Sequence, residues 1–170
     1  MTTPDQQTAN RLFLAFKDMQ DAMRYLDAYA ELEQMQRERG DSFFFDHCEA
    51  ILSAAIVAYC RPFKHSRSKG QAAPKLAADS LDAVQQQPAL HALLETKRDT
   101  FIAHADWEAR PTAFVRIDGN AVLRQSPMPS VHKGLNIEDF RELVKNVGYE
   151  CRRKAFELDF AHGAGQADAG

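Results

Sequence analysis

Apolar residues recur at helical spacing over most of the chain. Between Pro4 and Arg39 they fall at steps of three or four, as in the series Leu12, Phe16, Met19, Met23, Leu26 and Ala30. This is the period of one face of an α-helix. Gly40 follows the basic turn that ends at Arg39 and is a natural stop signal. The pattern predicts one long amphipathic helix from about Pro4 to Arg39.

The next segment is apolar nearly all round. Asp41 or Ser42 can cap a helix that runs to about Cys60. Its central stretch, from Ala50 to Tyr59, reads Ala-Ile-Leu-Ser-Ala-Ala-Ile-Val-Ala-Tyr. Because such a helix has no polar face to turn toward water, it belongs in the centre of a bundle. Pro62 and the basic, Ser- and Gly-containing stretch from Lys64 to Pro74 then predict an exposed loop.

Three further helices are predicted beyond this loop. A short one covers Lys75 to Gln86, and a third long helix begins near Pro88 and continues to about Ala105. The apolar stripe of that long helix consists of Leu90, Leu94, Phe101 and Ile102. Asn136 can cap a last helix that runs to about Phe160. Residues 161–170 are expected to form a flexible C-terminal tail.

Between Pro111 and Pro129 the spacing of the apolar residues changes from helical to alternating. Alternating residues flank Asp118-Gly119-Asn120, which is a strong hairpin turn signal. Two short strands are therefore expected near 113–124. The predicted fold is all-α: an up-and-down bundle of four to five helices with a small β-hairpin insertion near 113–124. Residues 1–160 would form this single domain.

Composition and charge narrow the choice of function. The chain has 170 residues and a formal net charge of -3, so RNA contact would require a local basic cluster. Cys48, Cys60 and Cys151 lie in apolar helical patterns and are expected to be reduced core thiols. No apolar run approaches a membrane span, and the first residues lack a signal peptide pattern, so a cytoplasmic protein without membrane contact is expected. No metal-ligand spacing, phosphate-binding glycine loop or GxSxG turn is present, so neither a metal nor a cofactor is expected.

One segment combines residues that suit acid-base and phosphate chemistry. At the end of the third long helix, Arg98-Asp-Thr-Phe-Ile-Ala-His104 places an arginine, a polar Asp99 and a histidine six residues after the arginine. This resembles the signature of the HEPN (higher eukaryote and prokaryote nucleotide-binding) superfamily: an arginine, four to six residues and a histidine, commonly with a polar residue after the arginine. The upstream Tyr-Cys-Arg-Pro-Phe, at Tyr59 to Phe63, is similar to a helix end of one prokaryotic HEPN group.

The resemblance implies a metal-independent endoribonuclease that acts as a homodimer. As a further expectation, it would be a toxin or phage-defence effector with a nucleotidyltransferase-type antitoxin as partner. His104 would act as general base or acid toward the ribose 2'-hydroxyl. Arg98 would stabilise charge on the phosphoryl oxygens, and Asp99 would orient Arg98 or His104. Backbone phosphates would be held by a set of basic side chains: Arg61, Lys64, His65, Arg67, Lys69 and Lys97.

Other interpretations of the same residues stay open. His104 can instead cap a helix end, and Arg98 can form an ion pair with Glu95 or Asp99. In one straight helix Arg98 and His104 would lie about 120° apart, so they would meet only across a dimer. The alternative functions are a noncatalytic HEPN dimer that binds a nucleotide, an RNA or a partner protein, and a helical dimer with no site.

Overall fold

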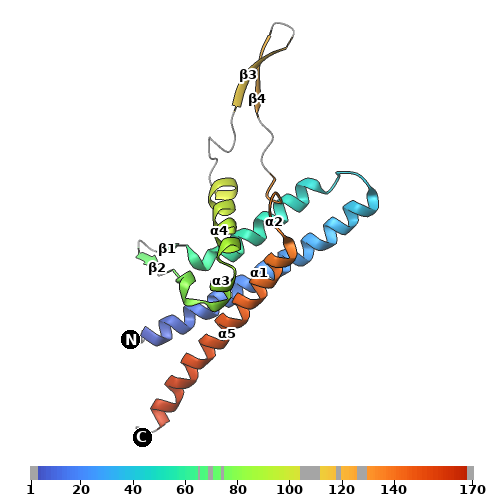
Figure 1. Cartoon of the computed structure of the whole chain (residues 1–170). Coiled ribbons are helices and arrows are strands. Elements are labelled where there is room, and N and C mark those ends of the chain that lie inside the picture. The colour runs from blue at the N-terminus through green and yellow to red at the C-terminus, as the bar shows by residue number, and fades with distance from the viewer. Residues whose placement is uncertain are drawn as a thin grey trace.

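The computed structural model describes residues 4–64, 66–68, 71–73, 75–103, 112–117, 120–125 and 130–167. Most of these residues are helical, which confirms the predicted helical class (Figure 1). The α-helices are α1 (Pro4–Arg39), α2 (Phe45–Cys60), α3 (Asp82–Gln86), α4 (Pro88–Lys97) and α5 (Ile137–Ala167). The 3₁₀ turns η1 (Arg61–Phe63) and η2 (Ala78–Ser80) and the π-helix η3 (Arg98–Ala103) complete the helical elements. None of the described helices is both long and apolar enough to cross a bilayer.

Helix α1 is the element against which both α2 and α5 pack (Figure 1). Its bounds coincide with those predicted from the hydrophobic period. Gly40 follows it with a φ of 70°, the left-handed conformation that terminates a helix at lowest cost in a glycine. The predicted cap of α2 was misplaced. Asp41 accepts a hydrogen bond from the Phe43 amide within the turn, and α2 begins only at Phe45 without a side-chain cap.

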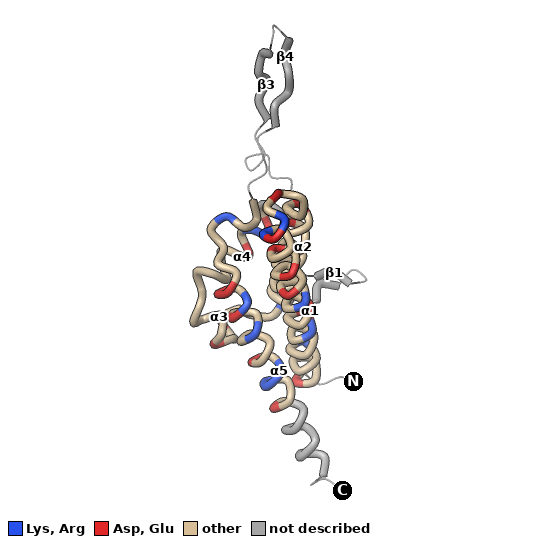
Figure 2. The backbone as a smooth tube through the Cα atoms, turned by 90° about the vertical axis from the view of Figure 1, so that its right-hand side faces the viewer, with Lys and Arg blue, Asp and Glu red and all other residues tan. Residues whose placement is uncertain are grey.

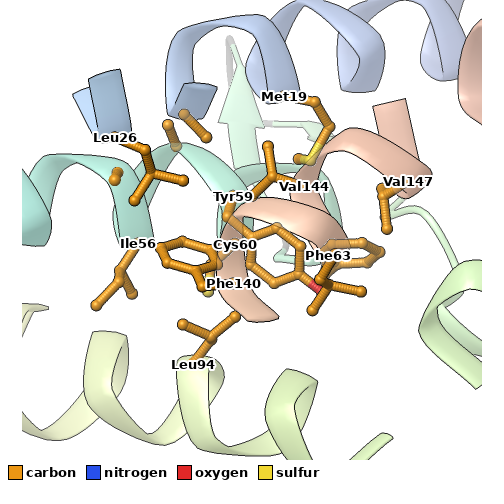
Figure 3. Close-up of a cluster of buried hydrophobic side chains, with 14 of the residues drawn as sticks. Met19, Leu26, Ile56, Tyr59, Cys60, Phe63, Leu94, Phe140, Val144 and Val147 are labelled. Carbon is orange, nitrogen blue, oxygen red and sulfur yellow. The ribbon is translucent and has the colours of Figure 1, made fainter. Parts of the chain in front are cut away.

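The core forms where α2 meets its neighbours. Helix α2 contributes seven buried residues, in keeping with its apolar sequence. Around Tyr59, Figure 3 shows side chains from α1, α4 and α5, including Leu94 and Phe140. The rings of Tyr59 and Phe140 lie edge to face with centroids 5.7 Å apart. All three cysteines are free and buried, as predicted, and burial raises the pKa of the Cys60 thiol to about 12, so this thiol is not a nucleophile at neutral pH.

The connection between α2 and α4 differs from its prediction. Within the segment expected to be a loop, strands β1 (Ser66–Ser68) and β2 (Gln71–Ala73) pair antiparallel. The predicted helix from Lys75 to Gln86 is only the turn η2 and the short α3. The reason is a distant carboxylate: Glu150 of α5 accepts hydrogen bonds from the backbone amides of Asp82 and Ala83, at 3.0 and 2.9 Å. These contacts fix the start of α3 at Asp82.

Strands β3 (Thr112–Ile117) and β4 (Asn120–Gln125) lie where the sequence predicted two short strands. They pair antiparallel, with Thr112 opposite Gln125 and Ile117 opposite Asn120. The hairpin extends away from the helices in Figure 1. The last helix, α5, runs to Ala167 instead of ending at about Phe160.

A turn at residues 130–134 leads into α5 and is held by three helices. Glu49 of α2 accepts hydrogen bonds from Ser130 and from the Val131 amide. Tyr29 of α1 contacts the ring of His132. The Lys97 ammonium at the end of α4 donates to the Lys133 carbonyl at 2.7 Å. The start of α5 is therefore fixed against the same end of the bundle that carries Arg98.

The contribution of this core to the free energy of unfolding can be tested at Phe140. Phe140→Ala leaves a cavity beside Tyr59, and we expect it to lower the free energy of unfolding by about 3–5 kcal/mol. Phe156→Ala, on the exposed side of the same helix, is the matched control and should cost less than about 1 kcal/mol. Urea denaturation followed by circular dichroism measures both. Equal losses for the two variants would contradict the packing described here.

Candidate functional site

The helix that carries Arg98 changes its winding at that residue. Helix α4 ends at Lys97, and residues Arg98–Ala103 form a π-helix, in which each amide bonds to the carbonyl five residues back. Short π-helical turns are rare and frequently occur at functional sites. The assumption of one straight α-helix, which put Arg98 and His104 about 120° apart, is therefore wrong from Arg98 onward. His104 itself lies outside the described residues.

Arg98 and Asp99 are in direct contact. The Arg98 Nη1 donates to Asp99 Oδ1 at 2.6 Å, and the other carboxylate oxygen of Asp99 accepts from Lys64 Nζ at 2.9 Å. Partial burial would raise the pKa of Asp99, but the hydrogen bonds from Arg98 and Lys64 outweigh it and hold the pKa below its ordinary value. Asp99 is therefore ionised at neutral pH and bridges two cations.

Lys64 lies between two carboxylates on successive turns of the helix. Its ammonium is 3.0 Å from Glu95 Oε1 as well as 2.9 Å from Asp99 Oδ2. Burial opposes the charge of Lys64, but the hydrogen bonds to Asp99 and Glu95 raise its pKa above the ordinary value. The side chains of Arg98 and Lys64 are 31% and 27% exposed. The basic segment after α2 thus reaches Asp99, beside Arg98, through Lys64. The sequence alone had not decided whether this segment lies near Arg98.

The contacts continue inward from Glu95 to a buried histidine. His91 Nε2 lies 3.7 Å from Glu95 Oε2, and His91 Nδ1 lies 2.8 Å from the Tyr59 hydroxyl. The ring of Phe63 packs edge to face on His91, with centroids 4.8 Å apart. Burial lowers the pKa of His91 despite the nearby carboxylate, so the imidazole is neutral at pH 7. Burial also raises the pKa of Tyr59, which keeps its hydroxyl protonated.

We call these six residues the Arg98 network: Arg98, Asp99, Lys64, Glu95, His91 and Tyr59. The Glu95 carboxylate favours a proton on the facing Nε2 of His91, so Nδ1 accepts the hydrogen bond from Tyr59. Sequence reasoning missed His91. Its spacing of four residues from Glu95 on one helix face was a usable signal, but its contact with Tyr59, 32 residues away, was not visible in the sequence.

Two of the predicted phosphate-binding residues point elsewhere. Arg61 Nη1 lies 2.8 Å from Asp18 and 3.7 Å from Asp21, so this guanidinium is turned toward α1. Lys97 is 2% exposed and its ammonium donates to the Lys133 carbonyl. Burial lowers the pKa of Lys97. Its place in the apolar series with Leu90 and Leu94, at steps of four and three, could have revealed this burial from the sequence.

The remaining predicted residues add nothing to the described site. His65 and Lys69 lie outside the described residues, and Arg67 belongs to β1, of which only the backbone is described. Within the part of the chain that the structure describes, no three His, Cys, Asp or Glu side chains are placed to hold a metal ion. Of the whole predicted set, the structure brings together Arg98, Asp99 and Lys64.

No protein-family model matches this chain, and comparisons with curated proteins and with solved structures find no significant match. The HEPN resemblance therefore rests on the two segments quoted above. These segments do lie together: Tyr59 and Phe63 contact His91 of α4, and Lys64, directly after the first segment, contacts Asp99 of the second.

His91 should give the protein a distinct pH dependence. Because its folded-state pKa lies below the unfolded value of about 6.5, its contribution to stability is complete above that pH. The contribution is lost as the pH falls through 6.5, by at most about 1.4 kcal/mol per pH unit for one proton. His91→Gln removes the titrating group while keeping a polar partner for Tyr59.

We therefore expect the stability of the wild type to fall more steeply than that of His91→Gln between about pH 7.5 and 5.5. Urea denaturation at each pH measures the difference, in which the carboxylates common to both forms cancel. His47→Gln, at the exposed start of α2, is the control and should follow the wild type. Parallel curves for the wild type and His91→Gln would show that His91 is not held neutral by the fold.

Proposed function

We propose that this protein is a metal-independent endoribonuclease of the HEPN type that acts as a homodimer. The observation that carries the proposal is the contact of Lys64 and Arg98 with the same carboxylate, Asp99. This contact links the end of the Tyr59–Phe63 segment to the Arg98 motif and puts two cations on one carboxylate of that motif. Arginine and lysine in this setting are suited to an anionic phosphodiester.

His104 would take the proton from a ribose 2'-hydroxyl. The 2'-oxygen then attacks the adjacent phosphorus, and the bond from phosphorus to the 5'-oxygen breaks. The leaving 5'-oxygen receives a proton from the second copy of the motif in the dimer. The products are a 2',3'-cyclic phosphate and a 5'-hydroxyl. A group that titrates near neutrality suits both proton transfers.

Arg98 would stabilise the negative charge that develops on the phosphoryl oxygens. Its guanidinium carries five N–H donors, more than the bond to Asp99 uses, and its fork geometry fits two phosphoryl oxygens at once. Asp99 acts as the positioning residue, because its bond to Arg98 Nη1 orients the guanidinium before substrate arrives. Lys64 adds a second positive charge. The proposal extends to a cytoplasmic toxin or phage-defence effector that is paired with a nucleotidyltransferase-type antitoxin.

One observation favours a second candidate, a noncatalytic HEPN dimer that binds a nucleotide, an RNA or a partner protein. The two cations of the Arg98 network, Arg98 and Lys64, are matched by two carboxylates, Glu95 and Asp99. A phosphate entering this site would have to compete with both carboxylates for the cations. The two candidates differ in whether RNA is cut, which a direct assay decides.

The assay is cleavage of total cellular RNA by the purified protein in EDTA, with analysis of the product ends. We expect the wild type to leave 2',3'-cyclic phosphates. His104→Ala should slow cutting by about 10²–10⁴-fold, the usual contribution of a general base. Arg98→Lys should slow it by about 10²-fold or more, because lysine keeps the charge but cannot form the bidentate contact.

His47→Ala and Arg37→Lys are matched controls, since both residues are exposed on α2 and α1 away from the network, and neither should alter the rate. Equal cutting by the wild type and His104→Ala would reject the assigned mechanism. A folded dimer that does not cut would favour the noncatalytic candidate. A monomer in sedimentation experiments would contradict both candidates, because each of them requires the motifs of two copies to meet across a dimer.

A further inference from the structure

A groove runs between α1 and α5 on a face that takes no part in the Arg98 network. It has a volume of about 540 Å³. Its apolar lining consists of Phe16, Met19, Met23, Val144 and Gly148. Gly148 allows α5 to approach α1 closely, because a Cβ atom there would lie 3.1 Å from Met19 Cβ. Met19 and Val144 are themselves buried by this approach, whereas Phe16 and Met23 are only partly buried and form the open apolar part of the lining.

The rim of the groove is strongly basic. Its cations are Lys17, Arg24, Lys145 and Arg152, and its one carboxylate is that of Asp21, which pairs with Arg24. Four positive charges less one negative leave a local charge of +3, in a chain whose formal net charge is -3. Figure 2 shows Lys and Arg positions along both helices. The groove therefore attracts anions although the whole molecule does not.

Aromatic rings alternate with these cations along α5. Lys145, Tyr149, Arg152 and Phe156 follow one another at steps of four, three and four, which places them on one helix face. Tyr149 is 72% exposed and Phe156 is 47% exposed. The Arg152 guanidinium lies 5.7 Å from the ring centroids of both Phe16 and Phe156. Tyr149, Arg152 and Phe156 also line a second hollow that continues the groove.

We propose that the groove between α1 and α5 binds single-stranded RNA. Bases would stack on Tyr149 and Phe156, and phosphates would lie against Lys145 and Arg152. Alternating rings and cations fit a polymer that carries a flat base and a negative charge in every unit.

This inference deepens the proposed ribonuclease function and rests on it, since the groove would hold the substrate strand outside the site formed by Arg98 and His104. Asp21 links the groove to the turn that follows α2. It lines the groove and also lies 3.7 Å from Arg61, which stands three residues before Lys64 of the Arg98 network. The groove therefore extends to the junction of α1 with the end of α2.

The test uses a fluorescent 2'-O-methyl oligouridylate of about 20 nucleotides, longer than the usual span of a single-strand site. The methyl group removes the attacking hydroxyl, so binding is measured without cleavage. Fluorescence anisotropy gives the Kd at several salt concentrations. Tyr149→Ala should weaken binding about tenfold through lost stacking. Lys145→Gln/Arg152→Gln should weaken it further and reduce the slope of log K against log salt by about 1.4.

The matched controls are Tyr25→Ala and Arg37→Gln/Lys75→Gln, which change exposed residues outside the groove. They should bind like the wild type. Absence of binding by the wild type, or equal affinities for groove and control variants, would overturn the inference. So would capture of an acidic amphipathic peptide in the groove in place of RNA. Melting curves verify that each variant is folded.

The outcome is separable from that of the cleavage assay. If the oligonucleotide binds and the groove variants weaken it, but ordinary RNA is not cut, the ribonuclease function fails and the groove stands. If ordinary RNA is cut through His104, but the groove variants bind and cut like the wild type, the groove proposal fails alone.

Discussion

The hydroxyl of Tyr59 sets the position of α4 against α2. Tyr59 is fully buried because α2 is apolar nearly all round and must be covered on every side. A buried hydroxyl without a partner is costly, and His91 of α4 supplies that partner at 2.8 Å. Once His91 is held there, Glu95 and Asp99 follow on the next two turns and meet Lys64. The rim ion pairs are therefore a consequence of a contact made in the core.

The long helices were predictable because their own residues specify them. A sustained hydrophobic period and a glycine stop were enough to fix α1 from Pro4 to Arg39. The segment after α2 was not predictable in the same way, since the start of α3 depends on Glu150, 67 residues further along the chain from Ala83. The π-helix at Arg98 likewise has no signal in the local sequence, which continues a helical pattern. An interaction between segments distant in the sequence therefore decided where α3 begins.

The residues of the candidate site were likewise predictable where their contacts are local in the sequence and not where those contacts are distant. Arg98 and Asp99 were found because the motif is local, and their contact joins adjacent residues. Lys64 and Lys97 were both predicted to bind backbone phosphates, yet the fold turns Lys64 to Asp99 and buries Lys97 against the Lys133 carbonyl. The apolar stripe that includes Leu94 would have separated them, because Lys97 continues that stripe. The residue types therefore suggested a phosphate-binding site. The helix face on which each residue lies determines whether its side chain can reach that site.

The distribution of charge bears on how such a site could act on RNA. The Arg98 network is neutral in sum, while the groove carries a local charge of +3. The groove would thus attract a polyanion such as RNA from a distance, whereas the Arg98 network would interact with a phosphate only on direct contact. Asp99 also stabilises the close approach of Arg98 and Lys64. Without it, Arg98 and Lys64 would repel each other at the rim, whereas its carboxylate holds both cations in place before a phosphate arrives. In the proposed mechanism, a phosphoryl oxygen would use the Arg98 N–H groups that do not bond to Asp99, so a network that is neutral in sum is compatible with phosphodiester chemistry.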